Sequence, residues 1–277
     1  IPDVSHREDL EFPEWTKTET SEFHRREEII SKSSIKAIAI ITNAGILKDK
    51  ISNLYKAAKD RIYVINHRPS LAISNFDKYD QNLSNKVKKI HKLPDKYIFY
   101  PAMYLPHKNH KYIIDVIKII DSNKNFNLSA VFCGSDKGYL EKIKKYSSDN
   151  KINDKILFLD YVEDEHLPYL YLNSKALVMP TFSGPTNIPP WEAFKMEIPV
   201  FYSKLENIEK VYKNAVYYIN PYDPNSLVNG LKEVLNQKEQ INKLTNFGKD
   251  LLNSIDAEQE FNQLFQILRK RKKIRSS

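Results

Sequence analysis

The sequence predicts an α/β protein built from doubly wound parallel sheets, and three observations support this prediction. Short apolar, β-branched runs alternate with amphipathic helical stretches from about residue 35 to residue 260. Such alternation is typical of βαβ units, whose strands are buried on both faces. The chain has 277 residues, of which 41% are hydrophobic and 12% aromatic, enough for a substantial core. A single cysteine, Cys133, excludes an internal disulfide framework, so the fold depends on packing.

The first third of the chain carries only part of this pattern. We expect strands at 35–41 and 61–66, with a helix at 46–58 between them. The polar segment 67–85 has no clean period and is interpreted as a linker. Two parallel strands form too small a sheet to be stable alone. Because the chain also begins with Ile1, we expect it to be a fragment or a processed chain.

The rest of the chain carries the alternation in full. Strands are expected over the apolar runs 97–102, 128–134, 156–162, 176–180, 198–202 and 215–219. Helices are expected at 110–120, 139–147, 165–172, 189–195 and 224–235. The last stretch, 240–270, is expected to be mostly helical, with interruptions at Gly248 and Asp256.

The net charge of +8 is concentrated near the C-terminus. Six basic residues supply most of it and leave +2 for the remaining chain: Arg269, Lys270, Arg271, Lys272, Lys273 and Arg275. This tail has two interpretations, a solvated terminus or a contact with anionic lipid headgroups at about 1 kcal/mol per basic residue. No basic stripe with interleaved aromatic residues runs through the body, so nucleic acid is not expected as a partner. No apolar run reaches the roughly 18 residues of a membrane-spanning helix.

The segment 181–195 has the pattern of a ligand-binding loop. An apolar run leads into the turn-rich stretch TFSGPTN, and two prolines then open a helix. Loops at the carboxyl ends of parallel strands bind ligands, and helix N-termini attract anions. The arrangement therefore indicates a phosphate-bearing ligand. Glu192, in the first turns of this helix, either accepts hydrogen bonds from that ligand or only favours the start of the helix.

Four segments follow one another in a recognisable order. They are FYPAMYLPHKNH (99–110), VFCGSDKGY (131–139), FLDYVEDEHLPYLYLNSKALVMPT (158–181) and FSGPTNIPPWEAFKMEIPVF (182–201). In this order and spacing the chain resembles the retaining, nucleotide-sugar-dependent glycosyltransferases of family 4, also called group 1. A thinner match covers DVSHREDLEFPEW (3–15) and HRRE (24–27).

The resemblance implies a GT-B fold, in which two Rossmann-like doubly wound domains face each other. Residues 1–85 would then be part of the N-terminal acceptor-side domain with a linker, and residues 86–260 the nucleotide-sugar-binding domain. Residues 261–277 would be the end of a helix and the basic tail.

The resemblance also implies a role for each residue of the predicted site. Lys108 matches the lysine that binds the diphosphate, Glu192 the glutamate that binds the ribose hydroxyls, and His6 a histidine that faces the transferred sugar. A fixed cation beside a departing diphosphate stabilises the transition state more than the ground state. The other predicted donor contacts are Gly134, Ser135, Gly184, Pro185, Thr186, Asn187 and Ile188.

Two positions depart from the family's usual pattern. Gly184 stands where a glutamate that contacts the sugar is usual, and the pair Ala102-Met103 lacks the usual arginine. The motif GPTN-PP-EA matches a variant within the family, so we expect the backbone of Gly184 to approach the ligand. Other interpretations remain: Asn187 as a helix cap, His6 as a surface residue near a ragged terminus, and Lys108 as a solvated side chain.

The resemblance implies a metal-independent enzyme of the hexosyltransferase type. It would move a sugar from a nucleotide diphosphate sugar to a glycan or lipid-linked acceptor, in surface polysaccharide or lipopolysaccharide synthesis. No cofactor is expected, and no metal, because His107 and His110 have no neighbouring carboxylate or cysteine. The implied location is cytoplasmic, with the inner membrane surface as a narrower alternative. The alternative functions are a non-catalytic nucleotide-sugar or glycan-binding module and a GT-B phosphorylase or epimerase.

Overall fold

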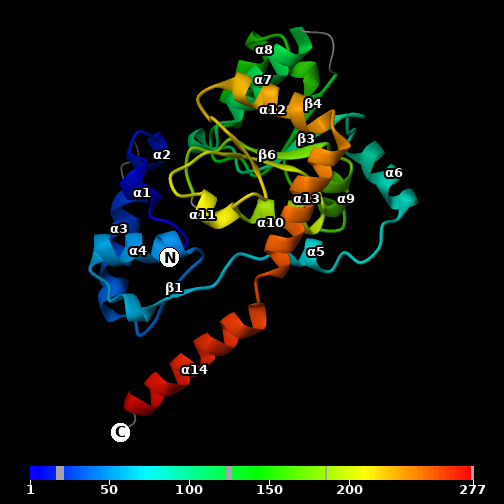
Figure 1. Ribbon diagram of the computed structural model, residues 1–277. Coiled ribbons are helices and arrows are strands. Elements are labelled where there is room, and N and C mark those ends of the chain that lie inside the picture. Colours follow the sequence, from blue (N-terminus) through cyan, green and yellow to red (C-terminus); the bar gives the residue numbers. More distant parts are fainter. Residues whose placement is uncertain (17–21, 123–126, 185, 276–277) are drawn as a thin grey trace. The chain divides into compact units, whose positions relative to one another are not determined.

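A computed structural model describes residues 1–16, 22–122, 127–184 and 186–275, with residue 257 and residues 270–275 described by backbone alone. The chain divides into two compact units (Figure 1). Unit 1 comprises Ile1–His67, Ser183–Asn187 and Asn253–Ser277, and unit 2 comprises Arg68–Phe182 and Ile188–Leu252. The predicted domain boundaries at residues 85 and 260 remain a prediction.

Within the described residues, unit 2 contains a six-stranded parallel sheet in the order β5-β4-β3-β6-β7-β8. Its strands are β3 (Tyr97–Pro101), β4 (Ser129–Cys133), β5 (Ile156–Leu159), β6 (Ala176–Met179), β7 (Val200–Ser203) and β8 (Tyr217–Ile219). In the centre of the sheet, Phe99 pairs with Val131 on one side and with Leu177 on the other. These residues are completely buried, which explains why the central strands have continuous apolar sequences.

The helices of unit 2 cover both faces of this sheet. They are α5 (Leu71–Ser74), α6 (Gln81–Ile90), α7 (His110–Ser122), α8 (Leu140–Asp149), α9 (Leu167–Leu172), α10 (Ile188–Lys195), α11 (Glu209–Tyr212), α12 (Pro224–Leu235) and α13 (Lys238–Asn253), with the 3₁₀ turns η2 (Pro106–Lys108) and η3 (Asn153–Lys155). Right-handed crossovers that run in opposite directions from the sheet centre place their helices on opposite faces. Accordingly, α7 contacts α8 and α12 on one side of the sheet, and α5 contacts α9 and α10 on the other (Figure 1).

Unit 1 is built, in its described part, on a two-stranded parallel sheet of β1 (Ile40–Thr42) and β2 (Ile62–Val64). Its helices are α1 (Ser5–Glu8), α2 (Pro13–Thr16), α3 (Glu22–Lys36), α4 (Gly45–Tyr55) and α14 (Ala257–Arg275), with the 3₁₀ turn η1 (Lys59–Arg61). One apolar cluster joins α3 and α4 to the strands: Val4, Ile30, Ile40, Leu47, Ile51, Tyr55, Ala57 and Ile62. The strand predicted at 35–41 is shorter than expected, because α3 continues to Lys36.

The segment 67–85, interpreted from the sequence as a linker, contains α5 and the start of α6. Its role as a linker remains a prediction. The Asp80 carboxylate caps α6 by accepting from the backbone N–H groups of Asn82 (2.7 Å) and Leu83 (3.2 Å). Leu83, Val87 and Ile90 recur at helical spacing in α6, and Val87 is fully buried, so the periodicity of this segment already indicates a helix.

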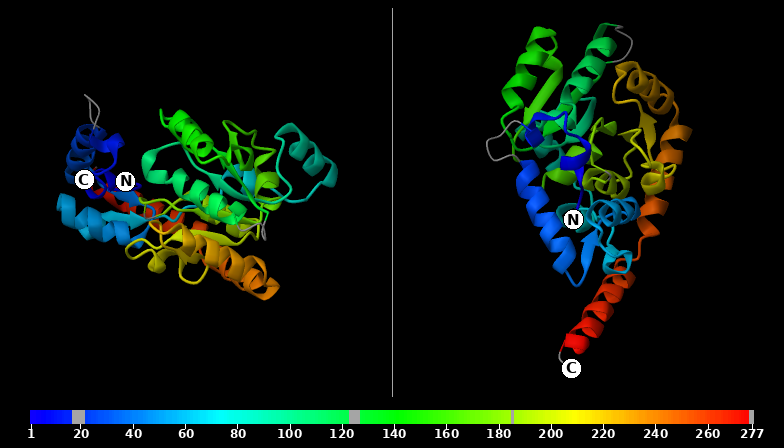
Figure 2. Two further views of the ribbon diagram at one scale, coloured as in Figure 1. Left: turned by 90° about the horizontal axis from the view of Figure 1, so that it is seen from above. Right: turned by 90° about the vertical axis from the view of Figure 1, so that its left-hand side faces the viewer.

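The C-terminal stretch confirms one expected interruption and contradicts the other. The helical conformation is interrupted between α13 and α14 (Figure 1 and Figure 2). There the Asp256 carboxylate accepts a hydrogen bond from the Gln259 N–H at 2.9 Å. Gly248, in contrast, lies inside α13 without breaking it. A Cβ atom at Gly248 would lie 2.5 Å from Cδ1 of Phe194, so the glycine allows α13 to pack against that ring.

The basic residues of the tail lie in the last turns of α14. Arg269 is exposed, and the side chains that follow it are outside the described part of the structure. No described helix combines the length and the apolar character needed to cross a membrane.

Candidate functional site

The strand order of unit 2 reverses between β3 and β6. From β3 the chain proceeds outward to β4 and β5, and from β6 it proceeds outward to β7 and β8. In open α/β sheets such a switch point, at the carboxyl ends of the strands, is where ligands bind. The segment with Lys108 follows β3, and the segment leading to Glu192 follows β6.

The backbone around Lys108 is held by several hydrogen bonds. Lys108 ends the turn η2, and its carbonyl oxygen accepts from the Tyr100 hydroxyl at 2.7 Å. The next residue, Asn109, adopts a left-handed conformation with φ 56°. Its Nδ2 donates to the carbonyl oxygens of Pro180 (3.1 Å) and Pro221 (3.0 Å). Asn109 therefore ties together the segments that follow β3, β6 and β8.

A second set of hydrogen bonds joins the same two segments one residue earlier. The carbonyl oxygen of His107 accepts from the Phe182 N–H at 2.9 Å and from the Thr181 hydroxyl at 3.2 Å. Thr181 is completely buried, and His107 is nearly so. The segment with Lys108 and the segment leading into α10 thus lie against each other at one edge of the sheet.

Glu192 is a buried carboxylate, with 5% of its surface exposed. Its Oε2 accepts from the Tyr171 hydroxyl at 2.5 Å, and its Oε1 accepts from the Ser70 N–H at 3.3 Å. Burial, followed by the nearby carboxylate, raises the pKa of Tyr171 well above its usual value, so its hydroxyl stays protonated and donates. Each carboxylate oxygen keeps a further lone pair, so Glu192 can still accept from a ligand.

We expect Tyr171→Phe to destabilise unit 2 by about 2 kcal/mol, because a buried carboxylate would lose a hydrogen-bond donor. Urea unfolding followed by tyrosine and tryptophan fluorescence measures this change. Tyr161→Phe is the matched control, since Tyr161 is 78% exposed. Equal unfolding midpoints for both variants would show that Glu192 does not depend on the Tyr171 hydroxyl.

Gly134 and Ser135 follow β4, next to the segment after β3. A Cβ atom at Gly134 would lie 2.3 Å from the carbonyl oxygen of Ala102, closer than atoms can approach. The carbonyl oxygen of Ser135 accepts from the Tyr104 N–H at 3.1 Å, while the residue itself is exposed. Glycine is therefore required here by backbone packing, independently of any ligand.

The predicted contacts at 184–187 lie in unit 1. Gly184 has φ +99°, a conformation that side-chain-bearing residues rarely adopt, which explains glycine where glutamate is usual. Thr186 is 8% exposed, and its hydroxyl has no hydrogen-bond partner among the described groups. Asn187 directly precedes α10, and Ile188, its first residue, is 42% exposed. Pro185 lies outside the described residues.

His6 is completely buried, so its interpretation as a surface residue was wrong. Its Nε2 lies 3.2 Å from Oε2 of Glu27 and 3.2 Å from the Tyr55 hydroxyl. Burial, and then the charge of Arg26, lowers the pKa of His6 against the opposing effect of Glu27. Arg7 pairs with Glu27, and this hydrogen bond lowers the carboxyl pKa to about 2. At neutral pH the cluster holds a neutral imidazole beside an ionised carboxylate.

Helix α1, which carries His6, contacts the start of the 183–187 segment within unit 1. The Ser183 hydroxyl donates to the Ser5 hydroxyl at 2.7 Å, and both residues are buried. Nothing in the sequence pairs these two serines, because they are far apart along the chain. The structure thereby joins the N-terminal motif to the motif that contains Gly184 and Thr186.

His110 is a core residue, with 1% of its surface exposed. Its ring packs against the rings of Tyr100, Tyr104 and Phe132, with centroid distances of 4.8, 5.1 and 5.1 Å. Burial lowers its pKa to about 3, so it is neutral at physiological pH.

Sequence reasoning missed Asn109, Tyr171 and Ser70. Asn109 had a usable signal, since asparagine favours the left-handed conformation and follows Lys108 in the motif. Tyr171 and Ser70 had no such signal, because their partner Glu192 is distant in the sequence.

Residues 82–251 match the family described as glycosyl transferases group 1. The O-antigen chain mannosyltransferase RfbU of Salmonella typhimurium is 26% identical over 208 residues, which cover 75% of this chain and 54% of that protein. The chain thus spans about half the length of this relative.

Two solved structures have similar folds. A glycosyltransferase from Rickettsia africae superposes with a TM-score of 0.74 at 14% identity, covering 88% of this chain and 66% of that chain. Anabaena HepE, in complex with UDP and glucose, superposes with a TM-score of 0.75 at 12% identity, with the same coverage. These similarities confirm the predicted α/β fold of the GT-B type with Rossmann-like parallel sheets.

Proposed function

This chain belongs to the group 1 glycosyl transferases, and from that membership we propose that it transfers a sugar from a nucleotide diphosphate sugar to an acceptor hydroxyl. The observation that carries this proposal is the placement of Lys108 and Glu192. They follow the two strands that flank the switch point of the sheet, and hydrogen bonds from Asn109, Thr181 and Phe182 join their segments.

Lys108 is assigned to the diphosphate. As the bond between the sugar and the diphosphate breaks, negative charge accumulates on the leaving group. A lysine whose backbone is already held in place supplies a compensating charge without reorganisation. The hydroxyl of Thr186 and the backbone of Gly184 are assigned to the sugar and phosphate. The Thr186 hydroxyl is buried and has no hydrogen-bond partner among the described residues.

Glu192 is assigned to the ribose, because a carboxylate can accept from two neighbouring hydroxyls at once. His6 is assigned to the transferred sugar: it is neutral and buried on α1, which contacts the 183–187 segment in unit 1. A nitrogen of the His6 ring can donate a hydrogen bond to a sugar hydroxyl or accept one from it.

We propose a retaining, front-face reaction without a metal. The acceptor oxygen forms a bond to the anomeric carbon on the side that the diphosphate leaves, and the acceptor proton passes to a diphosphate oxygen. The protein positions the reactants and stabilises the departing charge. Nuclear magnetic resonance of the product tests this step, since an inverted anomeric centre would contradict it.

The acceptor is proposed to be a glycan or a lipid-linked glycan of bacterial surface polysaccharide or lipopolysaccharide. The relative RfbU is named an O-antigen chain mannosyltransferase, so donors that carry mannose are the first to test. A cytoplasmic location at the inner membrane surface is part of this proposal. The basic end of α14 would contact anionic lipids there.

A screen of UDP-, GDP- and other nucleotide sugars by calorimetry, followed by turnover assays with glycan acceptors, tests the function. Binding with turnover supports the transferase. Binding without turnover would support the non-catalytic module instead. Phosphorolysis or epimerisation of the sugar would support the other GT-B alternative. No binding of any nucleotide sugar would contradict the transferase.

We expect Glu192→Gln to weaken donor binding by roughly 10- to 100-fold, because hydrogen bonds to a charged acceptor contribute about 1.5–3 kcal/mol. Calorimetric titration with the donor identified in the screen measures the change. Glu206→Gln is the control, since Glu206 is exposed outside this segment. Equal affinities of the two variants would remove Glu192 from the ribose contact.

A further inference from the structure

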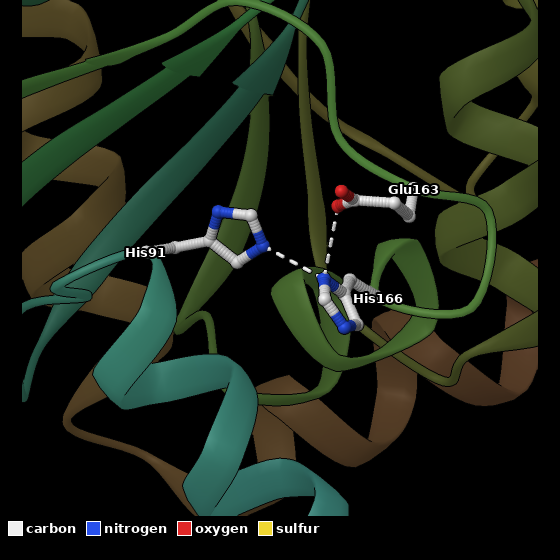
Figure 3. Close-up of side chains that lie close together, drawn as sticks. All are labelled: His91, Glu163 and His166. Atoms are coloured by element: carbon white, nitrogen blue, oxygen red, sulfur yellow. Dashed lines mark hydrogen bonds and ion pairs between the residues drawn. The ribbon is translucent and has the colours of Figure 1, made fainter.

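Two histidines and a glutamate converge outside the segments that hold Lys108 and Glu192. Nε2 of His91 lies 2.9 Å from Nδ1 of His166, and the same Nδ1 lies 3.1 Å from Oε2 of Glu163 (Figure 3). One potential ligand atom from each residue lies within 4.8 Å of the other two. This His91–Glu163–His166 cluster belongs entirely to unit 2.

Local structure brings these side chains together from two parts of the chain. Glu163 and His166 are three residues apart in a turn before α9, where the His166 N–H donates to the Glu163 carbonyl oxygen at 2.9 Å. His91 caps the C-terminus of α6, with its N–H donating to the Val87 carbonyl oxygen at 3.0 Å. The contact between α6 and α9 then brings His91 close to His166 and Glu163. Figure 3 shows these three side chains pointing toward one another.

The cluster places three basic atoms around one point. A neutral imidazole carries a single N–H proton, and Nδ1 of His166 faces both Nε2 of His91 and the Glu163 carboxylate. If Nδ1 accepts from His91, its lone pair points toward that donor and it has no proton for the carboxylate. If it donates, one proton must be shared between two acceptors. A cation would satisfy all three atoms together.

These three ligand atoms match a divalent cation of intermediate softness, between hard and soft metal ions. Two imidazole nitrogens and one carboxylate oxygen are typical zinc ligands, and a tetrahedral site with bonds of about 2.1 Å separates its ligand atoms by roughly 3.4 Å. The separations of 2.9 and 3.1 Å differ from this by a few tenths of an ångström. Glu163 is exposed, so an ion can enter from solvent.

We propose that His91, Glu163 and His166 form a binding site for a divalent cation of the zinc class. The ion would hold the end of α6 to the turn before α9. These helices are already linked by the Asn173 amide, which donates to the Ser84 hydroxyl at 3.2 Å, and by the Asp80 N–H, which donates to the Tyr169 hydroxyl at 3.2 Å. The site is therefore structural, and its affinity does not depend on the proposed sugar transfer.

Calorimetric titration of the chelator-treated chain with ZnCl₂ tests the site. We expect one ion per chain, and a melting temperature about 5 °C higher when zinc is about 100-fold above its dissociation constant. Titration with Co²⁺ should produce the visible absorption of a nitrogen- and oxygen-ligated ion. An absorption band from sulfur would instead assign the binding to Cys133 and overturn the proposal.

The variants His91→Ala and His166→Ala should each weaken zinc binding at least tenfold. His24→Ala is the control, because His24 is an exposed histidine of unit 1. Glu163→Gln changes an exposed side chain and stays informative if a histidine variant fails to fold. If zinc binds equally to the unmodified chain, His91→Ala and Glu163→Gln, the proposal is wrong.

Discussion

Lys108→Ala should lower the turnover of a nucleotide sugar about 100-fold or more. The lysine is half-buried at the end of η2, and the hydrogen bonds of Tyr100 and Asn109 hold its carbonyl group and the residue that follows it. Removing the side chain leaves these bonds in place but deletes the charge that we propose to stabilise the leaving group. Steady-state kinetics should therefore show the loss mainly in kcat.

Two variants separate this effect from a general loss of charge. Lys118→Ala removes an exposed lysine from α7, whose ammonium donates to Asn150 at 2.8 Å, and should leave the rate unchanged. Lys108→Arg keeps a positive charge and should recover part of the activity. If Lys108→Ala turns over at the unmodified rate, the lysine does not contact the leaving group.

Gly134→Ala should destabilise unit 2 by about 3 kcal/mol, because overpacking against immobile atoms forces the backbone to shift. The added Cβ would lie 2.3 Å from the Ala102 carbonyl oxygen and 2.9 Å from the Met103 nitrogen. These atoms begin the segment that leads to Lys108, so donor binding should weaken as well. Urea unfolding and calorimetric titration measure the two changes.

Gly45→Ala is the matched control for this substitution. Apart from its chain neighbours and the backbone of its own helix, no described atom lies within 4 Å of a Cβ at Gly45, the first residue of α4, so this variant should be neutral or slightly stabilising. A Gly134→Ala variant as stable as Gly45→Ala would show that β3 and β4 can separate at their ends without cost.

The fold class could be predicted from the sequence because parallel strands buried on both faces produce continuous apolar runs. Runs 97–102 and 176–180 coincide with β3 and β6, which lie in the centre of the sheet. The prediction failed where the cause lies far away along the chain. Gly248 does not interrupt α13, because the glycine makes room for the Phe194 ring that this helix covers.

The candidate site shows the same division. Lys108 and Glu192 could be selected from motifs, because a lysine after a strand and a carboxylate early in a helix are local features. The supporting contacts could not be predicted. Asn109 bonds to Pro180 and Pro221, Glu192 accepts from Tyr171, and each pair meets only in the folded chain.

Local periodicity was thus sufficient for the α/β class and most strands, and motif order for selecting Lys108 and Glu192 as candidate site residues, because each depends on neighbours within a few positions. Long-range packing was needed to bury His6 beside Glu27, to join Ser5 to Ser183, and to bring His91 to His166. The reason is physical: these contacts join segments whose separation along the chain carries no periodic signal, so only the closing of each core brings them together.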